Sequence, residues 1–270
     1  MNSADTVYVS DNDPSPPSSP HTTYESFLPS KTGVTPHSVY LSKKDIARFQ
    51  PERWLNDEAV NFGLSMWYER FITSSLSSLK IVVFSTWFYS HLINNGPESV
   101  RRWTKWVNFP QLDLAIIPIC QEYHWFVIIV CYPQLCLSQE PHHHCSILFM
   151  DSLGLKWGHN RKRVKEWLEL ELKIQYGLQN LPEIFSADIP VPVQPNDFDC
   201  GPYMIHYIDR FIRNFSLIEQ AVEKKQLSDL QCSSGLSIWQ PMFAKNKRQH
   251  LHIHAQRFWQ ISYKTDTVYE

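Results

Sequence analysis

Three near-continuous apolar runs lie in the middle of the chain, at residues 112–119, 125–132 and 146–150. They are rich in β-branched residues, which favour strands, and their lack of polar alternation is typical of strands covered on both faces. We therefore expect them in the middle of one sheet. Residues 81–84 predict a further short strand, and Ile189–Val193, with two prolines, predicts a short strand at a sheet edge.

Helices are predicted on both sides of these runs. Ser42 can cap a short helix, and Asn56 or Asp57 can cap a second helix whose apolar residues recur at helical spacing. Further helices are expected over residues 98–106, 161–176 and 201–215, the last with Pro202 near its first position. Helices, then a central sheet, then helices indicate an α+β fold.

The ends of the chain differ from its middle. Residues 1–36 are rich in Ser, Pro, Thr and Asp, and such a segment buries too little apolar surface to offset the entropy cost of ordering. We expect a disordered tail over 1–36, one folded domain over 37–232, and a C-terminal extension over 233–270 whose structure the pattern does not define.

Composition narrows the function classes. The net charge of -2 gives no global basic field for nucleic acid, and no apolar window approaches the roughly 18 residues of a membrane span. The 8 glycines include no phosphate-binding loop, so we expect no cofactor. Six cysteines without an N-terminal secretion signal predict reduced thiols in the nucleus and/or cytoplasm.

Cys200 is the first candidate for chemistry, because it lies where a loop meets a predicted helix. The partial positive charge and free N–H groups of a helix N-terminus favour the thiolate, which is the nucleophilic form. The same N–H groups can stabilise an oxyanion, and Gly201 permits close approach of a substrate. From the local sequence alone, a small buried structural cysteine is equally consistent.

A cysteine nucleophile needs a base, and the base needs a group that orients it. His124 begins an apolar run, so it lies at a strand mouth, and Asp151 directly follows the run 146–150. If the two strands are neighbours, Asp151 can accept the proton on the far nitrogen of His124. Taken singly, a core histidine and a turn-forming aspartate are the simpler interpretations.

Taken together, four segments resemble the SUMO-specific cysteine protease family, over about residues 38–215. They are Trp54-Leu55-Asn56-Asp57, His124-Trp125, Asp151-Ser152-Leu153-Gly154, and Gln194 to Gly201 with the sequence QPNDFDCG. The resemblance implies a papain-related, adenain-like fold with the catalytic Cys200 at a helix N-terminus. It also implies a monomer that cleaves after the terminal Gly-Gly of a ubiquitin-like modifier, most simply SUMO, in deconjugation or precursor processing.

The resemblance also implies roles for other residues. Gln194 is expected to donate a side-chain hydrogen bond to the oxyanion, beside the backbone N–H of Cys200. Trp54 and Trp125 are expected to cover a narrow tunnel that admits only glycines, although core packing would explain each tryptophan alone. Asp57 could pair with a basic residue of the modifier, or could serve in helix capping.

Three features depart from the family pattern, and one of them is the C-terminal stretch 233–270, which is longer than the family's usual ending. Residues 133–145 form an insertion between the second and third apolar runs, and Pro202 removes one N–H near the expected oxyanion site. The insertion is rich in cysteine and histidine, but the spacing matches no paired-ligand pattern, so we expect no metal.

Two other functions remain open from the sequence. Related proteins with a His, an acid and a Cys act as acetyltransferases, which use the thiol to carry an acetyl group from acetyl-CoA. A non-catalytic binder of ubiquitin-like proteins is the other alternative, although every catalytic position holds a competent residue.

Overall fold

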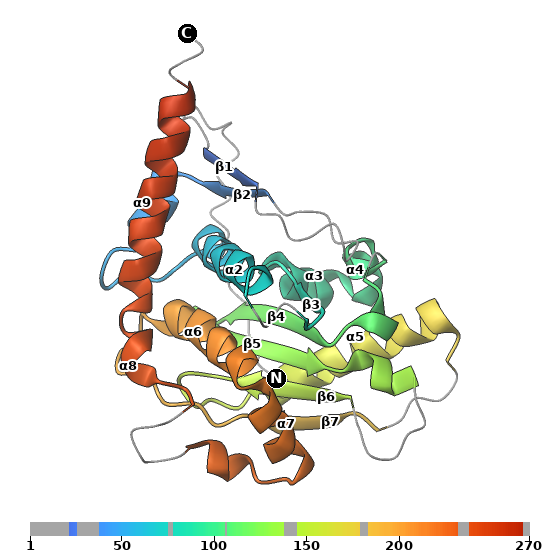
Figure 1. Ribbon diagram of the computed structural model, residues 1–270. Coiled ribbons are helices and arrows are strands. Elements are labelled where there is room, and N and C mark those ends of the chain that lie inside the picture. Colours follow the sequence, from blue (N-terminus) through green and yellow to red (C-terminus); the bar gives the residue numbers. More distant parts are fainter. Residues whose placement is uncertain are drawn as a thin grey trace, which may run out of the picture.

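The structure is a computed structural model that describes residues 22–25, 38–74, 78–105, 107–137, 145–178, 183–231 and 238–266. Its centre is a five-stranded mixed sheet (Figure 1). In spatial order the strands are β3 (Ile81–Val83), β4 (Leu114–Gln121), β5 (His124–Cys131), β6 (Ser146–Met150) and β7 (Phe185–Asp188). The three inner strands pair antiparallel and the two outer pairs are parallel. The three apolar runs are thus the middle of the sheet, as predicted.

Helices cover both faces of this sheet (Figure 1). The helices are α1 (Lys43–Ala47), α2 (Asp57–Ile72), α3 (Trp87–Asn95), α4 (Pro97–Thr104), α5 (Gly158–Tyr176), α6 (Cys200–Arg213), α7 (Phe215–Glu223), α8 (Pro241–Ala244) and α9 (Lys247–Asp266). Among the described residues, short 3-10 turns lie at Phe109–Gln111, Pro133–Leu137 and Leu227–Gln231. The α+β class is confirmed, because the sheet and helices form separate layers.

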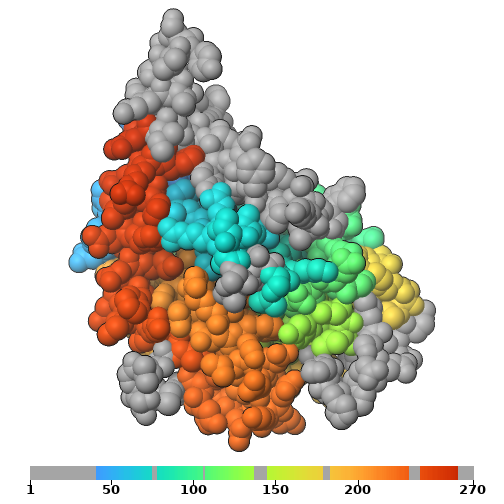
Figure 2. Space-filling view, viewed as in Figure 1, coloured from blue at the N-terminus to red at the C-terminus, as the bar shows by residue number. Residues whose placement is uncertain are grey.

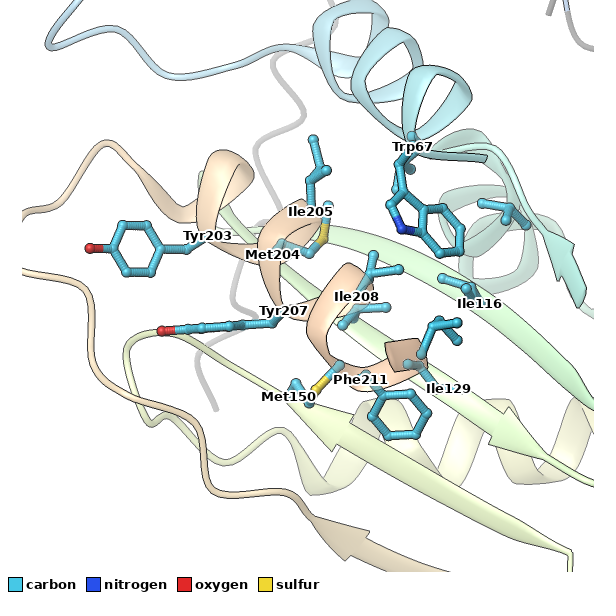
Figure 3. Packing of buried hydrophobic residues seen from close by; sticks show 14 of the residues in the cluster. Trp67, Ile116, Ile129, Met150, Tyr203, Met204, Ile205, Tyr207, Ile208 and Phe211 are labelled. Carbon is cyan, nitrogen blue, oxygen red and sulfur yellow. The ribbon is translucent and has the colours of Figure 1, made fainter. Parts of the chain in front are cut away.

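Successive residues of the inner strands enter two different cores. In β5, Val127 and Ile129 join the cluster that contains α2 and α6, whereas Ile128 and Val130 join the cluster that contains α3, α4 and α5. Because side chains alternate across a strand, an unbroken apolar run fills both cores. On α6, Ile205 and Ile208 lie on the side toward α2 and the sheet, while Tyr203 and Tyr207 extend to the other side of the helix, where they are buried in the same cluster (Figure 3).

The structure differs from the predicted elements at three places. The edge strand predicted at Ile189–Val193 is wrong: β7 is Phe185–Asp188, and the following prolines lie outside the ladder because proline has no N–H to donate. Helix α3 was not predicted, since its aromatic residues favour strands in isolation. Helix α6 starts at Cys200, one residue before the predicted start, so Pro202 is its third residue. A backbone N–H at this position has no partner within the helix, and proline is therefore tolerated there.

The expected domain boundaries also need correction. β1 (Thr22–Glu25) lies inside the predicted disordered tail and pairs antiparallel with β2 (Ser38–Leu41); the rest of 1–36 lies outside the described residues. The extension expected over 233–270, whose structure the pattern left undefined, contributes Trp239 and Leu251 to the same core as α2 and α6. In the space-filling view α9 covers one flank of the molecule, beside segments of α2 and α6 (Figure 2).

No helix within the described ranges has the length and apolarity that a membrane crossing requires.

Candidate active site

The sheet brings His124 and Asp151 to the same end of neighbouring strands. β5 begins at His124, β6 ends one residue before Asp151, and the two strands pair antiparallel. Helix α6, which packs against β5, places Cys200 at its first position. Three residues from distant parts of the sequence therefore meet at one end of the inner strands, as the sequence predicted.

His124 and Asp151 form a buried hydrogen-bonded pair. The distance from His124 Nε2 to Asp151 Oδ1 is 2.7 Å, and both side chains are less than one tenth exposed. Because Nε2 is occupied by the carboxylate, Nδ1 is the nitrogen left for the thiol of Cys200, with which His124 also interacts. The carboxylate thus fixes both the orientation and the tautomer of the imidazole.

The charge state of His124 is set by these two neighbours. Burial alone would lower the pKa of the imidazole, but the hydrogen bonds to Asp151 and Cys200 outweigh it and raise the pKa from 6.5 to about 9. At neutral pH the ring is therefore protonated, which is the state needed to pair with a thiolate and to donate a proton to a leaving group.

Asp151 has two further donors, one of which the sequence analysis missed. Its Oδ1 accepts the backbone N–H of Leu153 at 2.6 Å, and its Oδ2 accepts the indole N–H of Trp157 at 2.7 Å. Trp157 is itself held by stacking on Phe126, with ring centroids 4.9 Å apart. A tryptophan six residues after the aspartate carries no motif, so nothing in the sequence alone identified it.

The thiol of Cys200 lies at a tightly packed helix start. Cys200 is 1% exposed, and a Cβ added at Gly201 would lie 3.1 Å from a methyl carbon of Leu55. Glycine at 201 therefore allows the segment that contains Leu55 to approach the nucleophile closely. The helix N-terminus directs its free N–H groups to this point.

Gln194 is fixed in one orientation by Ser152, the neighbour of Asp151, and by Asn196 in the loop before Cys200. The hydroxyl of Ser152 donates to Gln194 Oε1 at 2.5 Å, and Gln194 Nε2 donates to the carbonyl of Asn196 at 2.6 Å. Gln194 is buried, and its backbone N–H donates to the carbonyl of Ser152. One N–H of the amide has no partner among the hydrogen bonds of the described residues, so a donor is available to an incoming oxyanion.

The two predicted tunnel tryptophans both adjoin Leu55, Trp54 along the chain and Trp125 through a hydrogen bond, and they differ in exposure. Trp54 is 46% exposed and its indole N–H donates to the carbonyl of Asp197, three residues before Cys200. Trp125 is buried, and its indole N–H donates to the carbonyl of Leu55 at 2.8 Å. Tyr123, an exposed residue that the sequence analysis did not select, stacks on Trp54 with ring centroids 5.8 Å apart.

Asp57 is partly buried rather than fully exposed at the surface. Asn56, not Asp57, is the N-cap of α2, because its side chain accepts the N–H of Ala59. Burial raises the pKa of Asp57, and a hydrogen bond with Thr86 opposes that rise. The expected pairing with a modifier stays a prediction.

The insertion carries no metal site within the described ranges, where no cluster of three or more His, Cys, Asp or Glu could hold an ion. Cys136 and Cys145 are buried, and residues 138–144, with their three histidines, lie outside the described residues.

A buried Cys–His–Asp set with the cysteine at the start of a helix is typical of cysteine proteases with a papain-like arrangement. Comparison with known proteins then identifies the family. The model of the Ulp1 protease family, C-terminal catalytic domain, matches residues 53–245, and the chain belongs to this family.

Named relatives agree with this assignment. Ubiquitin-like-specific protease 1D of Arabidopsis thaliana is 30% identical over 223 residues, which are 72% of this chain and 36% of the relative. Sentrin-specific protease 2 of Homo sapiens is 29% identical over 178 residues, 64% of this chain and 28% of that protein. The chain thus matches only about a third of the length of these relatives.

Solved structures support the fold. The crystal structure of a de-sumoylating protease is similar over 93% of this chain and 96% of its own, with a TM-score of 0.77 and 22% identity. A structure of the SUMO protease Ulp1 with its catalytic cysteine oxidised to a sulfonic acid covers 71% of this chain and 84% of its own, with a TM-score of 0.51 and 23% identity. The predicted family resemblance is confirmed.

Proposed function

We propose that this chain hydrolyses the bond after the C-terminal Gly-Gly of a ubiquitin-like modifier, with SUMO as the substrate. The observation that carries the proposal is the position of Cys200 at the start of α6, in contact with an imidazole that Asp151 orients. The relatives' names, ubiquitin-like-specific and sentrin-specific protease, support the substrate class.

In the proposed reaction the Cys200 thiolate attacks the carbonyl carbon of the terminal glycine, while His124 holds the thiol proton on Nδ1. The tetrahedral oxyanion accepts hydrogen bonds from Gln194 Nε2 and the Cys200 backbone N–H. His124 donates its proton to the leaving amine, and a thioester remains. Water then attacks the thioester with His124 as base, which releases the modifier's carboxylate and restores the thiol.

Trp54 supports the specificity for glycine. Its indole is bonded to Asp197 in the loop that leads to Cys200, so a substrate tail that reaches the thiol passes close to this ring. Residues without side chains fit most easily between a tryptophan and the backbone, and a covered site excludes water. The pair formed with Tyr123 extends this aromatic surface outward.

The test uses SUMO and ubiquitin that carry a fluorogenic amide at the terminal glycine. We expect the intact protein to release the fluorophore from SUMO and the Cys200→Ala variant to release none. Cleavage of ubiquitin alone would reassign the modifier, and transfer of an acetyl group from acetyl-CoA without cleavage of either protein would refute the protease proposal.

A further inference from the structure

Arg248, from α9, is buried against the loop that precedes Cys200. Its side chain is 8% exposed and its Nε donates to Asp199 Oδ1 at 2.6 Å, although the two residues are 49 positions apart. Asp199 is the N-cap of α6, directly before Cys200. A buried ion pair at this point ties the C-terminal helix to the residue before the candidate nucleophile.

The same guanidinium binds three backbone carbonyls. Its NH2 donates to Phe198 at 2.8 Å, and its NH1 donates to Arg48 at 2.9 Å and to Gln50 at 3.1 Å. Four of its five N–H groups are therefore engaged, and a planar guanidinium fixes its acceptors rigidly. Residues 48–50 and 198–199, which are far apart in the sequence, are held at fixed positions relative to each other.

From Asp199 the hydrogen bonds continue to Gln194. Asn196 donates from Nδ2 to Asp199 Oδ2 at 2.8 Å, and its Oδ1 accepts the N–H groups of Phe198 and Asp199. The carbonyl of Asn196 then accepts the amide of Gln194. One continuous network thus connects Arg248 to both groups that the proposed reaction uses as oxyanion donors.

We infer that Arg248 is a positioning residue, which sets the loop 194–199 so that Gln194 and the Cys200 backbone N–H converge on the oxyanion. The inference rests on the proposed function for its effect on catalysis. It gives the C-terminal helix, which the sequence left unassigned, a role in the active site. Small displacements of preorganised donors cost far more in rate than in substrate affinity, so the effect belongs in kcat.

Three variants test this role. Arg248→Gln removes the charge and the fork of donors, Arg248→Lys keeps the charge without the fork, and Asn196→Ala cuts the network while leaving Arg248 in place. Arg213→Gln is the matched control, because Arg213 donates from Nε to Asp209 on α6 in an exposed pair. Rates are measured on the fluorogenic SUMO substrate and divided by the concentration of reactive Cys200, so that unfolded protein does not count.

We expect kcat per active thiol to fall about tenfold or more in Arg248→Gln and Asn196→Ala, with KM within about twofold. The kcat of Arg248→Lys should lie between the kcat of these two variants and that of Arg213→Gln, which should equal the kcat of the unaltered protein. If Arg248→Gln does not fold, Asn196→Ala decides the question. Unchanged kcat in the variants that fold, even with a lower Tm, would reduce Arg248 to a stabilising residue and overturn the inference.

Hydrogen exchange separates this inference from the proposed function. In Arg248→Gln, amides of residues 190–202 and 48–55 should exchange faster than in the unaltered protein, while the sheet is unaffected. If the unaltered protein cleaves no modifier, the proposed function fails and the exchange result alone judges the network. If amide exchange in Arg248→Gln is unchanged, or is faster by the same factor throughout the protein, the positioning role of Arg248 is contradicted.

Discussion

At the scale of single residues, Asp151 has more partners than its role toward His124 requires. It accepts hydrogen bonds from His124, from the backbone of Leu153 and from the indole of Trp157. The last two satisfy carboxylate lone pairs that would otherwise be buried without donors, and so they hold the carboxylate in one orientation toward the imidazole. Support of this kind decides how closely His124 stays aligned with Cys200.

Replacement of Trp157 by phenylalanine should lower kcat about fivefold, because one hydrogen bond to the orienting carboxylate, worth about 1 kcal/mol, is lost while the stacking on Phe126 can persist. The measurement is steady-state hydrolysis of the fluorogenic SUMO substrate. Trp103→Phe, on α4, is the control and should leave the rate unchanged. Equal rates for both variants would exclude a contribution from the Trp157 N–H.

The raised pKa of His124 predicts a pH-dependent stability. Because the folded pKa of about 9 lies above the ordinary value of 6.5, folding favours the protonated ring. The contribution of His124 to the free energy of unfolding is fully present below about pH 6.5 and is lost as pH rises through about 9. The total loss is at most about 3 kcal/mol. Urea unfolding from pH 6 to 10 measures it. Asp151→Asn should flatten this loss, and an unchanged slope in that variant would contradict the assigned cause.

Some residues of the candidate site could be identified from the sequence, and others could not. Cys200, His124, Asp151 and Gln194 were selected because they form a recognisable ordered set. Trp157 and Arg248 were not, because each acts through one contact that depends on the folded path of the chain and has no fixed spacing from its partner.

At the scale of elements, the hairpin between β4 and β5 is strained next to the site. Glu122 and Tyr123 have φ values of 51° and 62°. These values lie in the left-handed region, which residues other than glycine and asparagine seldom adopt. The turn places Tyr123 on Trp54 and His124 at the start of β5. The strain is thus located where it orients residues of the candidate site.

Glu122→Gly should stabilise the protein by roughly 0.5–1 kcal/mol, since Glu122 is exposed and glycine adopts this φ without strain. Thermal unfolding followed by circular dichroism measures the effect, with Glu69→Gly in helix α2 as a contrast that should destabilise by roughly 1 kcal/mol. A lower Tm for Glu122→Gly would show that the carboxylate has a structural role that its exposure does not reveal.

Gly201→Ala should lower activity more than stability. The added Cβ would meet Leu55 at 3.1–3.3 Å, so the segment that contains Trp54 must move by a few tenths of an ångström. Such a shift changes the path to Cys200 while leaving the core intact, and a loss of about tenfold in kcat/KM is expected. An unaltered kcat/KM would mean that Leu55 can move without disturbing Trp54.

The elements that the sequence predicted correctly are those with a strong single pattern. The inner strands are unbroken apolar runs, and α5 and α6 show regular helical spacing. β7 was misplaced because its sequence, FSAD, has no alternation, and it forms a strand through parallel pairing with β6. Tertiary pairing of this kind outweighs local propensity.

At the scale of the whole molecule, the C-terminal helices complete the fold rather than extend it. Trp239 and Ala244 are almost fully buried in the core shared with α2 and α6, and α9 adjoins α1, α6 and α8. The sequence did not reveal this, because a helix rich in histidine and other polar residues buries only a few positions, such as Leu251 and Ala255.

Removal of residues 238–270 should therefore abolish cooperative unfolding, because it exposes the core face of α6 and leaves Asp199 without Arg248. Removal of residues 1–21 is the comparison, since a segment rich in Ser, Pro, Thr and Asp has little apolar surface to bury. Differential scanning calorimetry of both truncations provides the test. A normal transition in the C-terminal truncation would restore the boundary that the sequence suggested at residue 232.

The central claim is that Cys200 forms a thioester with the C-terminal glycine of a ubiquitin-like modifier. The most direct measurement replaces the terminal carboxylate of SUMO with a vinyl sulfone, which traps the attacking thiol as a stable thioether. Intact mass and peptide mapping should show one SUMO attached at Cys200, and none when His124 is replaced by alanine. Attachment at another cysteine, or no attachment while Cys200 still reacts with a small alkylating agent, would contradict the account.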